Sequence, residues 1–284
     1  MKVISTISGI KNEIRKPGSS PVGLVPTMGA LHEGHLSLTK YATAECPGVV
    51  VSIFINPTQF NDRNDLKNYP RTLDSDLDLL GRVLRSDDIV FTPEVEEMYP
   101  EEDSRVFSFG NLDRVMEALH RPGHFNGVAQ VVSKLFNIVD PDKAYFGIKD
   151  FQQLAVIKAL ARQMNSHIEI VPCPIIREDD GLAMSSRNRL LEAGIRKDAP
   201  VIYQTLSRVA EMIRVKDVPE IRKFVLDAIN KVPGFSVEYF EVADDVELIP
   251  VKCKQEFIPG RKYYGCIAVK AGKIRLIDNV QMSQ

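Results

Sequence analysis

The sequence contains no tryptophan, and its four cysteines form neither a Cys-x-x-Cys pair nor a metal-spaced set. We therefore expect reduced, mostly structural thiols, as in cytosolic proteins, at Cys46, Cys173, Cys253 and Cys266. The longest apolar run, around Val49–Ile55, is far too short to cross a bilayer, and the first residues contain no signal-peptide core. These absences predict a soluble, cytoplasmic protein with no membrane partner.

The sequence also lacks a strong excess of charge of either sign. The 36 basic and 38 acidic side chains give a formal net charge of −2, so electrostatics do not favour a nucleic-acid partner. A chain of 284 residues with 44% hydrophobic and 26% charged residues is typical of a globular protein and long enough for two domains.

Both common glycine-rich nucleotide motifs, GxGxxG and GxxxxGK[ST], are missing. Instead, the buried strand predicted at Val22–Val25 leads through a tight turn, Pro26–His35, into a helical pattern that starts at Leu36. A helix N-terminus with His32 and His35 beside it suits a phosphate, because free N–H groups and imidazole donors meet there. Our hypothesis is a nucleotide-phosphate site at which the two histidines stabilise charge during transfer. Alternatives are a simple helix cap or half of a metal site, although no cysteine or carboxylate completes a ligand pattern.

The remaining periodicity divides the chain into two parts. The first part alternates strands with helices, which predicts a Rossmann-like, doubly wound parallel sheet in a domain of residues 1–177. The second part, residues 178–284, reads as a smaller α+β domain with two helices followed by three strands. The strands expected in the first part are 49–55, 89–91, 143–147 and 167–171, and the helices are 72–85, one from about 113, 128–139 and 151–164. Those expected in the second part are helices 198–215 and 218–231 and strands 235–242, 262–270 and 274–277.

Four polar segments follow strand ends or form turns, and the carboxyl ends of parallel strands share one edge of a sheet. Besides the histidine turn they are Asn56–Gln59, Gly147–Asp150 and Met184–Asn188. The last segment combines serine hydroxyls with Arg187, which suits a phosphate cradle, although a plain turn is the alternative. We expect these segments to converge on one site.

Six sequence motifs, in this order, resemble the pantoate–β-alanine ligase family along essentially the whole chain. They are VPTMGALHEGH from Val25, FINPTQF from Phe54, YPRT from Tyr69, RPGHF from Arg121, AYFGIKDFQQ from Ala144 and DGLAMSSRN from Asp180. The resemblance implies a homodimeric ATP-dependent ligase of the HxGH nucleotidylyltransferase-like superfamily. In this family pantoate attacks the α-phosphate of ATP, pyrophosphate leaves, and β-alanine then attacks the bound pantoyl adenylate to give pantothenate, a coenzyme A precursor, and AMP.

The resemblance also implies the roles of individual residues. The catalytic set would be His35, His32, Lys149 and Arg187, and Gln59 would bind pantoate and β-alanine while Gln153 binds pantoate. Asn56, Tyr69 and His124 would also line the substrate site. The ATP site would consist of Met28, Gly29, Ala30, Leu31, His32, Glu33, Gly34, His35, Gly147, Ile148, Lys149, Asp150, Ile176, Met184, Ser185, Ser186 and Arg187.

The chemistry fits these residue types. Pantoate is already ionised at neutral pH, so the first step requires positioning and charge stabilisation rather than a base, and neutral glutamines orient the nucleophile without an opposing charge. The AMP phosphate and a histidine are the two alternatives for the group that accepts the proton of the β-alanine ammonium. Mg²⁺ is expected with ATP, with Asp76 and Asp150 as candidate ligands, and no permanently bound cofactor is expected.

Two other functions remain to be tested against this one. A nucleotidylyltransferase on the same fold would need a cationic pocket for a phosphate substrate, and the pair Gln59 and Gln153 argues against it. A nucleotide sensor without turnover would not require both histidines, Lys149 and Arg187.

Overall fold

The computed structural model describes residues 1–14 and 21–282 and contains a six-stranded, wholly parallel sheet in the order β1-β4-β3-β2-β5-β6. From β2 the chain builds outward through β3 and β4 on one side, and then through β5 and β6 on the other. The switch in direction therefore lies between β2 and β5, where open parallel sheets bind ligands. The strands are β1 (Lys2–Ile4), β2 (Val22–Thr27), β3 (Gly48–Ile53), β4 (Ile89–Phe91), β5 (Lys143–Gly147) and β6 (Glu169–Cys173).

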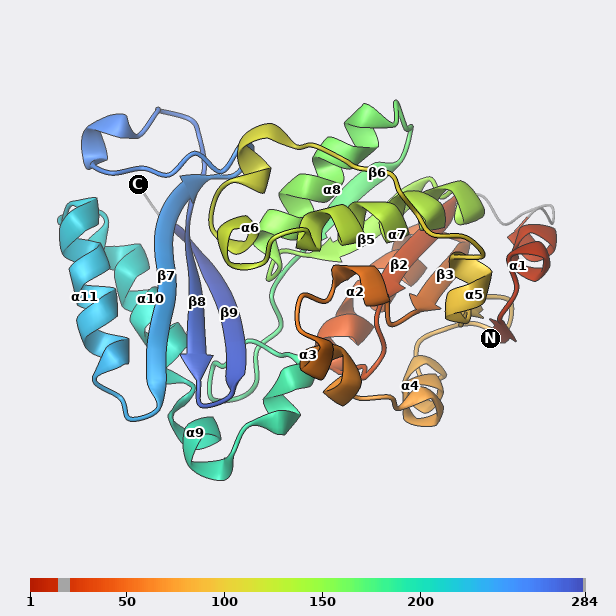
Figure 1. Ribbon diagram of the computed structural model, residues 1–284, viewed down its shortest axis with the longest axis horizontal. Helices are drawn as coiled ribbons and strands as arrows, with labels where there is room; N and C mark the ends of the chain where they lie inside the picture. The colour runs from red at the N-terminus through yellow and green to blue at the C-terminus, as the bar shows by residue number, and fades with distance from the viewer. Residues whose placement is uncertain (15–20, 283–284) are drawn as a thin grey trace.

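Helices cover both faces of this sheet, as Figure 1 shows for α7 and α8 across one of them. On that face α1 (Ile7–Ile14), α7 (His124–Val139) and α8 (Phe151–Gln163) contribute to one large apolar core. On the opposite face α2 (Glu33–Glu45) and the segment beginning with α4 (Leu73–Leu80) form a second core. Strands such as β3 are apolar on both sides because both faces are buried. Short elements connect these layers: η1 (Pro57–Gln59), α3 (Arg63–Asn68), α5 (Val95–Met98), η2 (Gly110–Asp113) and α6 (Glu117–His120).

The carboxy-terminal part has its own antiparallel sheet, drawn in blue in Figure 1, in the order β7-β8-β9. Its apolar core is separate and combines the sheet with two helices. Cys266 and Ala243 instead belong to the core of the first part, so the two parts pack together. The elements are η3 (Ser186–Leu190), α9 (Ala193–Asp198), α10 (Val201–Met212), α11 (Val218–Asn230), β7 (Phe235–Asp244), η4 (Lys254–Glu256), β8 (Tyr263–Ala271) and β9 (Ile274–Met282).

The predicted fold class, a Rossmann-like parallel sheet with a smaller α+β part, is confirmed. The helix expected from about residue 113 is wrong, because Met116 adopts a φ of 43° and separates η2 from α6. The helix expected over 72–85 ends at Leu80, before Gly81. Strand β1 and helix α1 were not predicted: β1 spans only three residues, and α1 buries only Ile10.

Candidate active site

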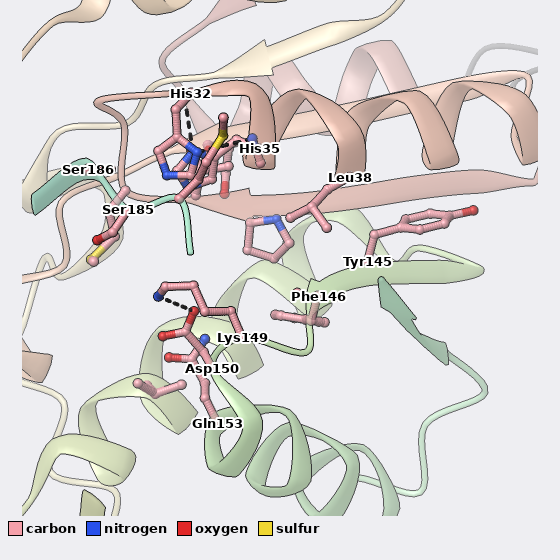
Figure 2. Close-up of a pocket in the computed structure, with 18 of the residues that line it drawn as sticks. His32, His35, Leu38, Tyr145, Phe146, Lys149, Asp150, Gln153, Ser185 and Ser186 are labelled. Carbon is pink, nitrogen blue, oxygen red and sulfur yellow. Dashed lines mark hydrogen bonds and ion pairs between the residues drawn. The ribbon is translucent and has the colours of Figure 1, made fainter. Parts of the chain in front are cut away.

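A cavity of about 220 Å³ lies at the carboxyl ends of β2, β3 and β5. Figure 2 shows the two histidines of the turn on one side of it and Lys149, Asp150 and Gln153 on the other. The four polar segments predicted to converge all contribute side chains to this cavity. The predicted site residues that line it are Met28, His32, Gly34, His35, Asn56, Gln59, Tyr69, Gly147, Lys149, Asp150, Gln153, Ile176, Met184, Ser185, Ser186 and Arg187.

The turn between β2 and α2 is held in shape by a buried carboxylate. Gly29 and Ala30 have φ values of 78° and 50°, a left-handed conformation that is costly for alanine. The backbone N–H groups of Ala30 and Leu31 donate to Asp76 over 2.9 and 2.8 Å, and Asp76 is only 2% exposed. A Cβ on Gly29 would lie 3.1 Å from an oxygen of Asp76, so this position requires glycine on two grounds.

His32 and His35 cap the first turn of α2 reciprocally. The Gly34 N–H donates to Nδ1 of His32 over 3.1 Å, and the His32 N–H donates to Nδ1 of His35 over 3.3 Å. Both Nδ1 atoms are thereby acceptors, so each neutral ring carries its proton on Nε2. Gly34 also keeps the cap compact, since a Cβ there would lie 2.8 Å from the His32 ring. The turn therefore presents two imidazole N–H donors beside the helix N-terminus.

The environment keeps both imidazoles neutral. Burial, followed by the positive charges of Lys149 and Arg189, lowers the pKa of His32 to about 4. Burial, followed by His32 and Lys149, lowers the pKa of His35 well below its usual value. At neutral pH the cationic charge facing a phosphate thus comes from lysine and arginine rather than from imidazolium.

The segment after β3 holds a glutamine amide in a defined orientation. Asn56 donates to Oε1 of Gln59 over 3.0 Å, which leaves the Gln59 NH₂ group 3.0 Å from the weakly accepting Sδ of Met28. Asn56 also donates to the Gly127 carbonyl over 3.1 Å and accepts from the Tyr99 hydroxyl over 2.9 Å. Asn56 is 1% exposed, so these bonds hold the Gln59 amide from a buried support.

Helix α7 packs against this segment unusually closely. A Cβ on Gly127 would lie 2.3 Å from the Thr58 carbonyl oxygen, so only glycine permits the approach. At the start of the same helix, Nδ1 of His124 donates to the Gln59 carbonyl over 2.8 Å. Burial, followed by the charge of Arg121, lowers the pKa of His124 to about 4.

The opposite wall of the cavity carries charge. Nζ of Lys149 lies 3.3 Å from Oδ2 of Asp150. Burial acts to raise the pKa of Asp150, but Lys149, with Arg187 and Arg121, holds it below its usual value. Asp150 is therefore ionised at neutral pH and offers a carboxylate next to the lysine.

Residues after 177 complete the cavity. The Ser186 hydroxyl donates to the Ala30 carbonyl over 2.9 Å, which joins η3 to the histidine turn. The Arg187 guanidinium lies 5.3 Å from the centre of the Tyr69 ring and pairs with both carboxylate oxygens of Asp65, at 3.2 and 2.8 Å. The carboxylate thus occupies two nitrogens of the guanidinium and would compete with an anionic ligand for this arginine.

The chain matches known proteins along its whole described length. A model of the pantoate-beta-alanine ligase family matches residues 2–281. The chain belongs to the pantoate–β-alanine ligase family.

Individual relatives extend over the full chain. It is 51% identical to the pantothenate synthetase of Bacteroides thetaiotaomicron, with 100% of both chains covered, and 48% identical to that of Porphyromonas gingivalis strain W83, with 99% of both covered. The solved pantothenate synthetase of Thermus thermophilus superposes with a TM-score of 0.91, at 40% identity and 100% coverage of both chains. The solved Francisella tularensis pantoate-beta-alanine ligase, complexed with beta-gamma ATP and beta-alanine, has a TM-score of 0.79 at 32% identity and covers 100% of this chain and 98% of its own. The predicted enzyme class, an ATP-dependent acid–amino-acid ligase, is confirmed by this membership.

Six predicted site residues do not line the cavity of this family member. Gly29, Ala30 and Leu31 form the turn behind it, and their backbone is fixed by Asp76. Glu33 lies in a neighbouring depression, and His124 lines a smaller adjoining pocket that shares Lys149, Asp150 and Gln153 with the main cavity. Ile148 packs against the apolar core instead.

An apolar wall of the site was missed by the sequence interpretation. Val128, Val131, Val132 and Leu135 of α7 line the cavity together with Phe54. The apolar character of residues 128–139 was recognised, but a helix face that lines a cavity has the same periodicity as one buried in a core. Asp65, which pairs with Arg187, had no distinguishing signal in the sequence.

Of the two candidate magnesium ligands, only Asp150 lines the cavity. Both oxygens of Asp76 accept hydrogen bonds from the turn or from Thr72, so this carboxylate fixes the turn, which leaves Asp150 as the candidate that faces the cavity. Within residues 1–14 and 21–282, no group of three or more histidine, cysteine or acidic side chains could hold a metal. No helix in the same described ranges has both the length and the apolar composition needed to cross a membrane.

Proposed function

We propose that the protein condenses pantoate with β-alanine through a pantoyl adenylate and releases pyrophosphate and AMP. The observation that carries this proposal is one cavity in which two neutral Nε2–H imidazoles at a helix N-terminus face Lys149 and a pair of glutamines. Such a site has donors and charge for phosphates and neutral amides for a nucleophile that is already ionised.

In the first step, the pantoate carboxylate attacks the α-phosphate and pyrophosphate leaves. The Gln59 NH₂ group, held by Asn56 against a weak thioether acceptor, is free to donate to pantoate instead. Gln153 lies on the opposite wall, and the valines of α7 supply an apolar surface for the two methyl groups of pantoate. The glutamines thereby orient the nucleophile, while no cation lowers its reactivity.

Charge that develops during this step is met from three directions. The Nε2–H groups of His32 and His35 donate from the turn, and the N-terminus of α2 adds the positive end of its helix dipole. Lys149 and Arg187 provide positive charge, with Ser185 and Ser186 beside them. We propose His35 as the residue that stabilises the α-phosphate in the transition state, with His32 beside the other phosphates.

Mg²⁺ is proposed to arrive with ATP. The residues present fit an ion held mainly by phosphates and water, because Asp150 is a single ionised carboxylate at the phosphate end of the cavity. Mg²⁺ would neutralise phosphate charge there. In the second step β-alanine attacks the adenylate carbonyl, and its ammonium must first lose a proton.

We also propose that the protein consists of a domain of residues 1–177 and a lid of residues 178–284, and that it acts as a cytoplasmic homodimer. The division is supported by the separate cores on either side of it. Because Ser185 and Arg187 come from the second part, its closure would exclude water from the adenylate.

An isotope experiment tests the reaction. Pantoate labelled with ¹⁸O in its carboxylate is supplied with ATP and Mg²⁺, and β-alanine is then added. Transfer of label to AMP is expected, because the attacking oxygen stays on phosphorus when the amide forms. Unlabelled AMP, or ADP as the product, would overturn the adenylate route. Pyrophosphate release that continues over many turnovers without β-alanine would favour a nucleotidylyltransferase.

The glutamine assignment has its own test. Gln59→Glu and Gln153→Glu place a carboxylate beside the carboxylate of pantoate and should weaken pantoate binding, which calorimetry measures. Normal pantoate affinity in either variant would remove that residue from the pantoate site.

A further inference from the structure

Lys149 lies on a β-turn, Gly147–Asp150, whose two central carbonyls take no part in the turn's own hydrogen bond. The Asp150 N–H donates to the Gly147 carbonyl over 3.3 Å and closes the turn, and the Ile148 N–H donates to the Cys173 carbonyl over 2.9 Å. Neither Ile148 nor Lys149 has a positive φ, which agrees with a type I turn and excludes type II. The orientation of the peptide between these two residues therefore decides the direction in which Lys149 projects.

One side chain from the other sheet binds both central carbonyls. Nδ2 of Asn279, on β9, donates to the Ile148 carbonyl over 2.8 Å and to the Lys149 carbonyl over 3.1 Å. Asn279 is 3% exposed, so these bonds are shielded from water. An asparagine amide supplies two donors in one plane, which suits two neighbouring carbonyls.

Asn279 is itself fixed by its surroundings. It is paired with Cys266 in the register of β8 and β9, and its N–H donates to Oδ1 of Asp278 over 2.8 Å. Asp278 in turn accepts two hydrogen bonds from Arg177, at 2.7 and 3.0 Å, and the Arg177 guanidinium lies 3.6 Å from the centre of the Tyr203 ring. The amide thus reaches the turn from a rigid support.

We propose that Asn279 is a positioning residue that holds the Gly147–Asp150 turn so that Lys149 faces the phosphates. This inference rests on the proposed function of Lys149 in ATP binding. Without the two donors, the peptide between Ile148 and Lys149 can rotate, and the lysine ammonium moves away from the cavity. The carboxy-terminal sheet therefore shapes the ATP site from behind, in addition to the residues 185–187 that line it.

The test compares Asn279→Ala and Asn279→Asp with a matched control. Asn279→Asp keeps the size of the side chain but places oxygen opposite two carbonyls, so it should perturb the turn more than alanine does. The control is Asn111→Ala, because Nδ2 of Asn111 also joins the two parts of the chain through two consecutive carbonyls, those of Glu247 and Leu248, at 2.8 and 3.3 Å. Asn111 does not line the cavity.

Three quantities are measured for each variant: pantoate-dependent exchange of pyrophosphate into ATP, KM for ATP, and pantoate affinity by calorimetry without ATP. For Asn279→Ala we expect roughly a 10- to 100-fold loss in exchange kcat/KM for ATP. Pantoate affinity should stay within about twofold, since Gln59 and Gln153 are untouched, and Asn111→Ala should keep exchange within about twofold. A loss in exchange without a loss of pantoate affinity indicates a positioning role, because a general loss of structure would weaken the binding of both ATP and pantoate.

Three results would overturn the inference: exchange in both Asn279 variants within about twofold of the unsubstituted protein, an equal loss in Asn111→Ala, or an equal loss of pantoate affinity. If Asn279→Asp does not fold, Asn279→Ala decides the matter, and the reverse also holds. Absence of exchange in the unsubstituted protein would refute the proposed function instead. In that case the affinity of each variant for ATP, measured by calorimetry, still judges the role of Asn279.

Discussion

Asp76 connects folding stability to the ATP site, and replacing it should damage both. Its oxygens accept from the N–H groups of Ala30 and Leu31 and from the Thr72 hydroxyl, at 2.9, 2.8 and 3.1 Å. Asp76→Ala leaves the two backbone N–H groups without an acceptor in a buried site, at about 1–3 kcal/mol each. We expect the free energy of unfolding to fall by about 3 kcal/mol or more. Asp76→Asn retains one acceptor and should cost about half as much.

The functional loss should exceed what lost stability explains. Ala30 is held at a φ of 50° by these bonds, and without them the turn can relax to a less strained backbone. His32 and Gly34 follow directly, so the Nε2–H donors of the cap change position. We expect adenylation to fall roughly tenfold or more even at temperatures where the variant is fully folded.

Urea unfolding and pantoate-dependent pyrophosphate exchange measure the two effects. Asp88 supplies a matched control, because it is 1% exposed and accepts from the Val49 N–H over 3.0 Å, at the end of the sheet away from the cavity. Asp88→Ala should lose stability but keep its KM for ATP and its exchange rate. A stable Asp76→Ala, or a folded one with normal exchange, would refute the reasoning, and so would an equal loss of exchange in Asp88→Ala.

Three further perturbations test other parts of the site. Asp65→Asn removes a carboxylate that competes with phosphate for Arg187, so KM for ATP in steady-state assays should fall about two- to fivefold at low salt, whereas a rise would show that Asp65 assists binding. Gly127→Ala forces a Cβ to within 2.3 Å of the Thr58 carbonyl oxygen, and it should cost about 3 kcal/mol in urea unfolding and weaken pantoate binding; an unchanged variant would contradict the close packing. His124 has its pKa lowered from 6.5 to about 4, so the unfolded chain binds the extra proton and stability falls as pH drops from 6.5 towards 4. The unsubstituted protein should lose about 2 kcal/mol more unfolding free energy between about pH 8 and pH 5 than His124→Asn does. Equal losses in the unsubstituted protein and in His124→Asn would refute this assignment.

The residues that face the cavity were largely predictable because their signals are local. A buried strand that ends in Met28 to His35 and continues as a helix is visible in a short run of consecutive residues, and the same holds for Asn56 to Gln59 after β3. Parallel strands place such ends on one edge, so convergence follows from topology alone. The neutral state of the histidines did not follow, because it depends on burial and on Lys149, which is more than 100 residues away in the sequence.

The residues that support the site were not predictable for the opposite reason. Asp76 was considered as a metal ligand, because an acidic residue on a helix gives no indication that backbone N–H groups will surround it. Asn279 lies beyond the strand expected at 274–277, on the part of β9 that the pattern did not indicate, and its partners lie 131 and 130 residues earlier in the chain. Such contacts depend on how two sheets pack, which the periodicity of either one does not encode.

In the proposed site, the histidines and the cationic side chains contribute differently to phosphate binding. Burial lowers the pKa of His32 to about 4 and that of His35 well below its usual value, so neither ring contributes net charge near neutrality. Neutral rings instead offer N–H groups whose directions are fixed by the reciprocal cap, and fixed donors require no reorganisation when charge moves. The positive charges are those of Lys149, whose turn is bound by Asn279, and of Arg187, which is paired with Asp65. A site built in this way combines fixed N–H donors at the transferring phosphate with cations that attract ATP and also face the developing charge.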